Sequence, residues 1–279
     1  MEAAADPAVH PGAITRKLAD GSALVVSRYG GQVLSWSDAA GREMLYLSAA
    51  SSGVDGKPIR GGMPVCFPQF AARGTLPKHG FARTAVWTQP EQPAASPNRV
   101  HLQLREQVQT LAVWPHRFLL DLRVEFSGKH LHVTLQVKNT DVHAWNFTAA
   151  LHTYFRVDEV TEAALHGLRG VAYQDALDGG RRVEAAESMI QLNHAIDRVY
   201  LATPRSVSLD ERDRRLEIVQ RGFADTVVWN PGPGAAAILG DMPAGDERRM
   251  LCIEAGQVGN PISLKPGDSW LGSQETHLR

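Results

Sequence analysis

The sequence predicts an all-β fold, a large antiparallel β-sandwich, because apolar and polar residues alternate along several segments and helical patterning is scarce. The alternation is clearest in residues 99–105, 117–126 and 129–138, which are separated by Trp114-Pro115-His116 and by Ser127-Gly128. A period of two sends consecutive side chains to opposite faces of a strand. Segments of this kind, joined through breaks rich in proline and glycine, indicate an antiparallel sheet with one buried face.

The apolar face of each segment follows from the alternation. It consists of Val100, Leu102 and Leu104, then Phe118, Leu120, Leu122, Val124 and Phe126, then Leu131, Val133, Leu135 and Val137. Further strands are expected at 23–27, 33–37, 145–157, 207–209, 215–220, 226–229 and 249–253, and a helix only at 183–195. Without a βαβ alternation, a fixed repeat or a linker, residues 1–279 are expected to form one domain, with 1–12 as a flexible N-terminal extension.

Composition excludes several classes of function. The chain has 279 residues, 43% of them hydrophobic, and a formal net charge of −1, so no global field attracts nucleic acid or an anionic membrane. No apolar run approaches the ~20 residues of a membrane helix, and the N-terminus lacks a signal-peptide pattern. Cys66 and Cys252 lie among apolar residues and are expected to be buried free thiols. We therefore expect a cytoplasmic protein.

The histidines of the sequence do not by themselves define a metal site. His130 and His132 form an HxH pair on one face of a strand, but that face continues with polar residues. No third ligand is tied to them by a motif, so a solvated surface is the favoured interpretation. His277 lies in a polar stretch and is assigned to the surface by default. We predict neither a metal nor another cofactor.

Four residues stand out as candidates for a site. His152 lies within 145–157, a strand expected to face the core on one side and a semi-polar cavity on the other. Glu254 ends the run MLCIEAG, where a buried carboxylate is unfavourable unless it is paired or useful. Asp197 lies in AIDRVYL, and His79 lies between Lys78 and Gly80. From the residues alone, a core histidine, a structural ion pair and a turn aspartate remain open alternatives.

Several stretches together resemble a known family. In chain order they are RGGMPVCFPQF, LPKHGFAR, LHTYFRV, IDRVYL, VVWNP and CIEAG. They are similar to the signature segments of the glucose-6-phosphate 1-epimerases, a branch of the aldose 1-epimerase or galactose mutarotase-like family. The similarity runs from about Gly31 to the closing PGDSW, and the family fold is a large β-sandwich of the galactose mutarotase-like type.

The resemblance implies roles for particular positions. His152 and Glu254 match the catalytic histidine and glutamate of the family, and Asp197 matches an aspartate that holds sugar hydroxyls. The resemblance implies substrate contacts for Arg60, Arg83 and Asp197, and to this substrate-binding set we add Lys78 and, for orienting the sugar, His79. Lys78 departs from the pattern, because many relatives carry glutamine before HGFAR.

The chemistry of these residue types agrees with the resemblance. Interconversion of sugar anomers needs one general base and one general acid, and no cofactor. The segment 60–83 is not periodic, and two arginine forks in it suit the oxygens of a phosphate. Asp55 is the only acidic residue from position 55 to position 83, which argues against local ion pairs.

The expected function is therefore that of a monomeric mutarotase of a hexose 6-phosphate, D-glucose 6-phosphate first. A mutarotase of neutral aldoses such as galactose or glucose and a non-catalytic phosphosugar-binding module remain the alternatives.

Overall fold

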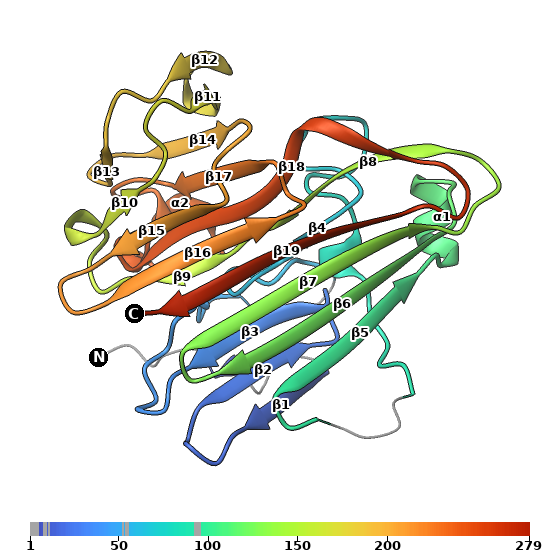
Figure 1. Ribbon diagram of the computed structural model, residues 1–279, viewed down its shortest axis with the longest axis horizontal. Coiled ribbons are helices and arrows are strands. Elements are labelled where there is room, and N and C mark those ends of the chain that lie inside the picture. The colour runs from blue at the N-terminus through green and yellow to red at the C-terminus, as the bar shows by residue number, and fades with distance from the viewer. Residues whose placement is uncertain (1–5, 8–9, 11, 52, 54–55, 92–95) are drawn as a thin grey trace.

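Antiparallel sheets account for most of the structure, a computed structural model that describes residues 6–7, 10, 12–51, 53, 56–91 and 96–279. Figure 1 shows long strands running side by side in layers, with a short helix at one end of the molecule. This arrangement confirms the predicted all-β, antiparallel class.

The described strands form three sheets, named here by a central strand. The small β2 sheet has the order β1 (Ala13–Lys17), β2 (Ala23–Ser27), β3 (Gln32–Ser37). The β7 sheet has the order β13 (Met189–Gln191), β10 (Ala164–His166), β15 (Ser206–Asp210), β16 (Arg215–Arg221), β19 (Ser269–Leu278), β7 (His130–Asn139), β6 (Phe118–Ser127), β5 (Arg99–Arg105). The β18 sheet has the order β12 (Arg181–Glu184), β11 (Ala172–Asp175), β14 (Ile196–Tyr200), β17 (Asp225–Asn230), β18 (Met250–Leu264), β8 (Trp145–Leu151), β4 (Val65–Cys66), and β9 (Tyr154–Arg156) also pairs with β18.

Helices are short. Those described in full are the α-helices α1 (Val108–Val113) and α2 (Ala236–Leu239) and the 3₁₀-helices η2 (Ala82–Thr84), η3 (Val160–Glu162), η4 (Ala176–Asp178) and η5 (Asp246–Arg249). No helix within the described part of the chain is long and apolar enough to cross a membrane.

The main core lies between the two large sheets. Leu122 and Leu135 from the β7 sheet belong to the same buried cluster as Phe147, Leu151 and Ile253 from the β18 sheet. The alternating residues that the sequence assigned to one face of β6 and β7 are buried, while His130, His132 and Thr134 on the other face are partly exposed. Period-two alternation thus placed the core correctly.

The predicted helix at 183–195 is wrong. Val183 belongs to β12 and pairs with Tyr173, whereas Ile190 belongs to β13 and pairs with Leu165. The apolar residues of this segment serve two short strands in different sheets. Pairing with distant strands has therefore outweighed local helix propensity, which is a weak determinant.

Two other expectations need adjustment. The strand expected at 145–157 is interrupted between Leu151 and Tyr154, so that β8 and β9 both pair with β18. Of the expected flexible extension at 1–12, residues 1–5, 8–9 and 11 lie outside the described residues. His10, which is described, is buried.

Candidate active site

His152 and Glu254 lie side by side on one face of the β18 sheet. Nε2 of His152 is 3.3 Å from Oε1 of Glu254, within ion-pair distance. The side chains are only 9% and 1% exposed, respectively. The structure therefore brings together the two residues that the sequence proposed as an acid–base pair.

Strand register explains why these residues meet. On either side of the pair, β18 aligns Ala255 with Leu151 and Cys252 with Tyr154. Continuing the same register places Glu254 opposite His152, in the gap between β8 and β9. The backbone N–H of His152 is released from the ladder here and donates to the carbonyl of Pro64 at 2.9 Å. Their side chains share one face because cross-strand partners always do.

Burial drives both groups toward their uncharged forms. It raises the pKa of Glu254 well above its ordinary value, and the nearby Asp197 carboxylate adds to the effect. Burial also lowers the pKa of His152 well below its ordinary value, with further contributions from His79, Arg83 and Arg60. A carboxyl that holds its proton beside a neutral imidazole is the arrangement that low dielectric favours.

Each member of the pair keeps one polar atom without a partner. Nδ1 of His152 and Oε2 of Glu254 are buried and make no hydrogen bond within the described part of the chain. Buried polar atoms of this kind are rare and are unfavourable by about 1–3 kcal/mol each. Such atoms are available for hydrogen bonds with a bound molecule.

Gln274, from the opposite sheet, holds the residues next to the pair. It extends from β19 in the opposite sheet, and its side chain is 1% exposed. Its Nε2 donates to the carbonyl of Ile253 at 3.1 Å, and its Oε1 accepts a hydrogen bond from the Thr153 hydroxyl. Ile253 and Thr153 directly adjoin Glu254 and His152 in sequence. One amide side chain thus joins the two strand segments that carry the pair.

His79 stands next to His152 as a neutral imidazole. Their ring centroids are 5.3 Å apart. Nδ1 of His79 accepts the backbone N–H of Ala71 at 3.3 Å and lies 3.2 Å from Sγ of Cys66. Burial, aided by the charges of Arg83 and Lys78, lowers the pKa of His79 to about 3. Because Nδ1 accepts, the proton of the neutral ring is on Nε2, and His79 can donate to a ligand.

Arg60 is already paired in the structure. Its guanidinium forms an ion pair with Asp241 at 3.0 Å, and its Nη1 donates to the hydroxyl of Tyr154 at 3.1 Å. The Tyr154 ring stacks on His152 with 4.8 Å between centroids, and Arg60 lies 5.8 Å from the Trp229 ring. The sequence argument against an acidic partner therefore fails for Arg60. That argument considered only residues close to Arg60 in the sequence, and Asp241 is far from it in the chain. Asp55, the one acidic residue from position 55 to position 83, lies outside the described residues.

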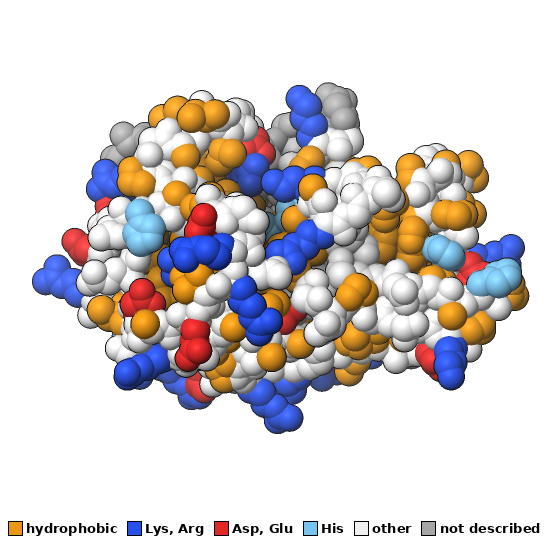
Figure 2. Space-filling view, turned by 90° about the horizontal axis from the view of Figure 1, so that it is seen from above, with side chains coloured by type: hydrophobic (Ala, Val, Ile, Leu, Met, Phe, Trp, Pro, Cys, Tyr) orange, Lys and Arg blue, Asp and Glu red, His pale blue; other side chains and the backbone are white. Residues whose placement is uncertain are grey.

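The other predicted binding residues lie around the pair. Asp197, on β14, is half-buried and aligned with Trp229 of β17, and burial raises its pKa. Arg83 donates to the backbone carbonyl of Lys78 at 2.8 Å. Among the described residues, no carboxylate forms an ion pair with either Lys78 or Arg83. Figure 2 shows lysine and arginine side chains around a hollow with a histidine side chain inside it.

Some residues around the pair were not predicted from the sequence as part of the site. Tyr154 and Trp229 lie in LHTYFRV and VVWNP, the stretches that carry the resemblance, so their position was a usable signal. Cys252 was assigned only to the core, yet it aligns with both Tyr154 and Trp229. Asp241 carried no signal, because it lies 181 residues from its partner Arg60.

The fold matches solved structures of mutarotase-like proteins. A crystal structure entitled as that of a "putative mutarotase" from Salmonella typhimurium superposes with a TM-score of 0.83 and 26% identity, covering 97% of this chain and 94% of that one. A galactose mutarotase-like protein from Lactobacillus casei superposes with a TM-score of 0.76 at 15% identity, covering 96% of this chain and 100% of that one. These matches define a galactose mutarotase-like β-sandwich.

The sequence comparison identifies the family. Residues 13–277 match Aldose 1-epimerase, and the chain belongs to the aldose 1-epimerase family. A protein of Cenchrus ciliaris named "Putative glucose-6-phosphate 1-epimerase" is 36% identical over 255 residues, covering 88% of this chain and 78% of that protein. A protein of the same name from Escherichia coli K12 is 32% identical over 231 residues, covering 81% and 76%. The family consists of isomerases that act on sugars.

Proposed function

We propose that the protein interconverts the α and β anomers of a hexose 6-phosphate, with D-glucose 6-phosphate as the first candidate. The observation that carries this proposal is the buried pair of His152 and Glu254. Within the described residues, each has a polar atom without a partner, and the nearby cations Arg83 and Lys78 have no acidic partner. The names of the relatives support the choice of sugar. We further propose that the chain works as a single unit and needs no second subunit.

In the proposed reaction, Glu254 removes the proton from the C1 hydroxyl while His152, as imidazolium, protonates the ring oxygen. The bond between C1 and the ring oxygen breaks, its electron pair stays on the oxygen, and a C1 aldehyde forms. Rotation about the C1–C2 bond exposes the other face of the aldehyde. The same proton transfers, run backwards, close the ring.

The protonation preferences of the site fit this sequence of steps. Ring opening converts a carboxylate and an imidazolium into a carboxylic acid and a neutral imidazole. These are the two forms that burial favours. Because burial favours the neutral forms in the free site, the proton would pass from Glu254 to His152 before ring opening, and opening would return the pair to the favoured forms. His79, with its proton on Nε2, would hold a sugar oxygen beside the pair.

The phosphate would be bound mainly by Arg83 and Lys78. Neither has an acidic partner among the described residues, and both charges are close enough to influence Glu254. Arginine matches phosphate oxygens in a bidentate manner, whereas lysine acts as a point charge. Arg60 fits a different role, because Asp241 already neutralises it. We assign it to holding Tyr154 against His152.

Mutarotation of a neutral aldose is the second candidate, and the pairing of Arg60 with Asp241 is the observation that favours it. If Arg60 is satisfied internally, only Arg83 and Lys78 remain to select a phosphate.

Anomer exchange measured by NMR on glucose 6-phosphate, glucose and galactose, with the spontaneous rate subtracted, tests both candidates. Fast exchange of the phosphosugar alone would support the proposal. Equal exchange of all three would assign the protein to neutral aldoses. Saturable binding of glucose 6-phosphate without exchange of any sugar would leave a binding module and remove the acid–base assignment.

A further inference from the structure

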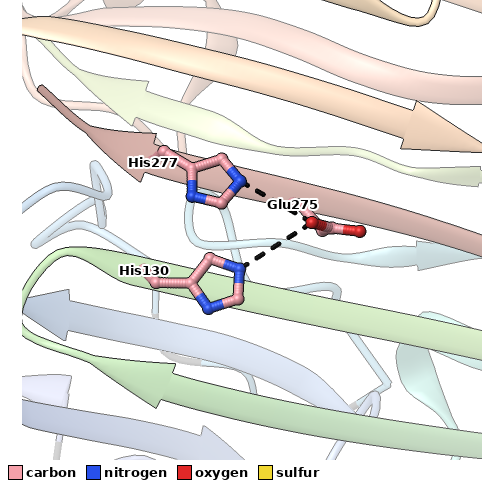
Figure 3. Close-up of side chains that lie close together, drawn as sticks. All are labelled: His130, Glu275 and His277. Atoms are coloured by element: carbon pink, nitrogen blue, oxygen red, sulfur yellow. Dashed lines mark ion pairs between the residues drawn. The ribbon is translucent and has the colours of Figure 1, made fainter.

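A second cluster of potential ligands lies on the outward face of the β7 sheet, at the ends of β7 and β19. It contains His130 from β7 and Glu275 and His277 from β19, and Figure 3 shows both imidazoles directed at the carboxylate. One nitrogen or oxygen atom from each of these residues lies within 4.8 Å of the others. None of the three belongs to the proposed acid–base site.

The sheet itself brings these side chains together. His130 and His277 are aligned directly across the two strands. The next pair outward is joined by a hydrogen bond from the Leu278 N–H to the Lys129 carbonyl at 2.9 Å. His130 and His277 therefore form a non-hydrogen-bonded pair, the kind with the closer side chains. Their rings stack at 4.6 Å and 17°.

The two oxygens of Glu275 face different partners. Oε1 lies 3.4 Å from Nε of Arg221 and 3.8 Å from Nε2 of His132. Oε2 faces the cluster instead, 3.6 Å from Nε2 of His277 and 3.9 Å from Nε2 of His130. Arg221 thus holds the carboxylate by one oxygen and leaves the other available.

One nitrogen atom of His130 lacks a hydrogen-bond partner among the described residues. That atom, Nε2, is buried. Its distance of 3.9 Å from Glu275 is too long for a hydrogen bond. A tetrahedral zinc ion with ligands at 2.0–2.1 Å would set its ligand atoms about 3.4 Å apart. The two histidine–carboxylate separations, 3.6 Å and 3.9 Å, are somewhat longer than that value, so the side chains would have to move together slightly around an ion.

We propose that His130, His277 and Glu275 form a binding site for a divalent transition-metal ion of the zinc class. Imidazole and carboxylate ligands suit Zn²⁺, and three of them leave a fourth position for water. His132 is not part of the set, because its Nε2 is engaged with the Thr134 hydroxyl at 3.2 Å. The ion would join β7 to β19 on the side of the sheet opposite Gln274.

Isothermal titration of the full-length, untagged protein with zinc chloride tests the proposal. Wild-type protein is expected to bind one ion, and His130→Ala, His277→Ala and Glu275→Gln should each weaken that binding at least about tenfold. Circular dichroism and thermal unfolding without zinc would verify that each variant is folded. The side chains are partly exposed, so we expect the variants to fold.

Two variants serve as matched controls. His132→Ala removes a neighbouring imidazole and should bind zinc as wild type does. His152→Ala addresses the other cluster that could hold a metal ion, formed by His152, Cys252 and Glu254, and should also leave the affinity unchanged. Absence of binding by the wild type, undiminished binding by His277→Ala, or loss of binding in His152→Ala would overturn the assignment.

Discussion

Oε1 of Glu254 lies 3.3 Å from Nε2 of His152, and both side chains are buried. Burial favours a state of the free protein in which the two groups hold one proton between them. That proton can sit on the carboxylate or on the imidazole, and burial favours the carboxylate. Neighbouring charges decide how far that preference extends, since Asp197 raises the pKa of Glu254 while Arg83 and Lys78 lower it.

Removing either member of the pair should abolish most turnover. We expect His152→Ala and Glu254→Gln to lower kcat by about 10²–10⁴, the usual contribution of a general acid or base. NMR exchange on glucose 6-phosphate, or on whichever sugar the wild type turns over, measures the effect. Unchanged exchange in either variant, with the fold intact by circular dichroism, would remove that residue from the mechanism.

The pH dependence of kcat/KM should be bell-shaped. A second proton on the pair must go to His152, whose pKa lies well below its ordinary 6.5, so the acid limb should fall well below pH 6.5. Loss of the shared proton follows the raised pKa of Glu254, so the basic limb should lie well above pH 4.5. Rates measured from pH 4 to 9, corrected for spontaneous exchange, test this. An acid limb at or above pH 6.5 would contradict a buried His152.

Glu254→Gln should stabilise the folded protein at neutral and basic pH. The folded-state pKa of Glu254 is raised, so its contribution to stability is complete below the unfolded pKa and is lost as pH rises. A neutral amide avoids that loss. We expect the variant to melt higher than wild type by about 2–4 °C at pH 8 for each kcal/mol recovered. The difference should shrink at pH 5, and a constant difference at both pH values would refute the linkage.

Arg83→Ala should act on the phosphate alone. Loss of a charge-assisted contact should raise KM for the phosphosugar by about tenfold or more, with little effect on any exchange of neutral sugar. Arg105→Ala, at an exposed position on β5 in the other sheet, is the matched control. Equal losses of exchange rate on phosphorylated and neutral substrates would show that Arg83 positions the segment 60–83 rather than the phosphate.

Gln274→Leu should loosen the pair without touching substrate. The buried Thr153 hydroxyl and Ile253 carbonyl would lose their partner, which should lower the free energy of unfolding by about 1–3 kcal/mol. Because the strands that hold His152 and Glu254 would shift, kcat should fall by about tenfold while KM changes little. Thr276→Val, on the same buried face of β19, removes a hydroxyl that has no hydrogen bond among the described residues, so it should leave kcat unchanged and should not lower the free energy of unfolding.

The sequence was sufficient where alternation determines structure. The paired faces of β6 and β7 followed from the spacing of Leu122, Val124, Val133 and Leu135 alone. It failed at 183–195, where β12 and β13 are held by strands from two different sheets. Short strands carry too few residues for their period to be recognised, so their conformation is set by partners that the local pattern does not reveal.

The candidate site was likewise predictable from the sequence only in part. His152 and Glu254 were proposed from motifs, but their contact depends on a register between strands about a hundred positions apart in the chain. The partner of Arg60, Asp241, lies in a loop without any local signal. Likewise, no sequence motif links His130 to Glu275 and His277. They lie together only because β7 pairs with β19.

Adjacent side chains of strand β19 point to opposite faces of its sheet. Gln274 reaches inward to the backbone behind the proposed acid–base pair, and Glu275 points outward to the proposed metal ligands. Because a strand alternates with every residue, inserting or deleting one residue ahead of this position would exchange the two side chains. Both sites would be lost in one event. We therefore expect an inserted residue to be tolerated in the turn at Lys265–Asp268 only if it leaves the register of β19 unchanged.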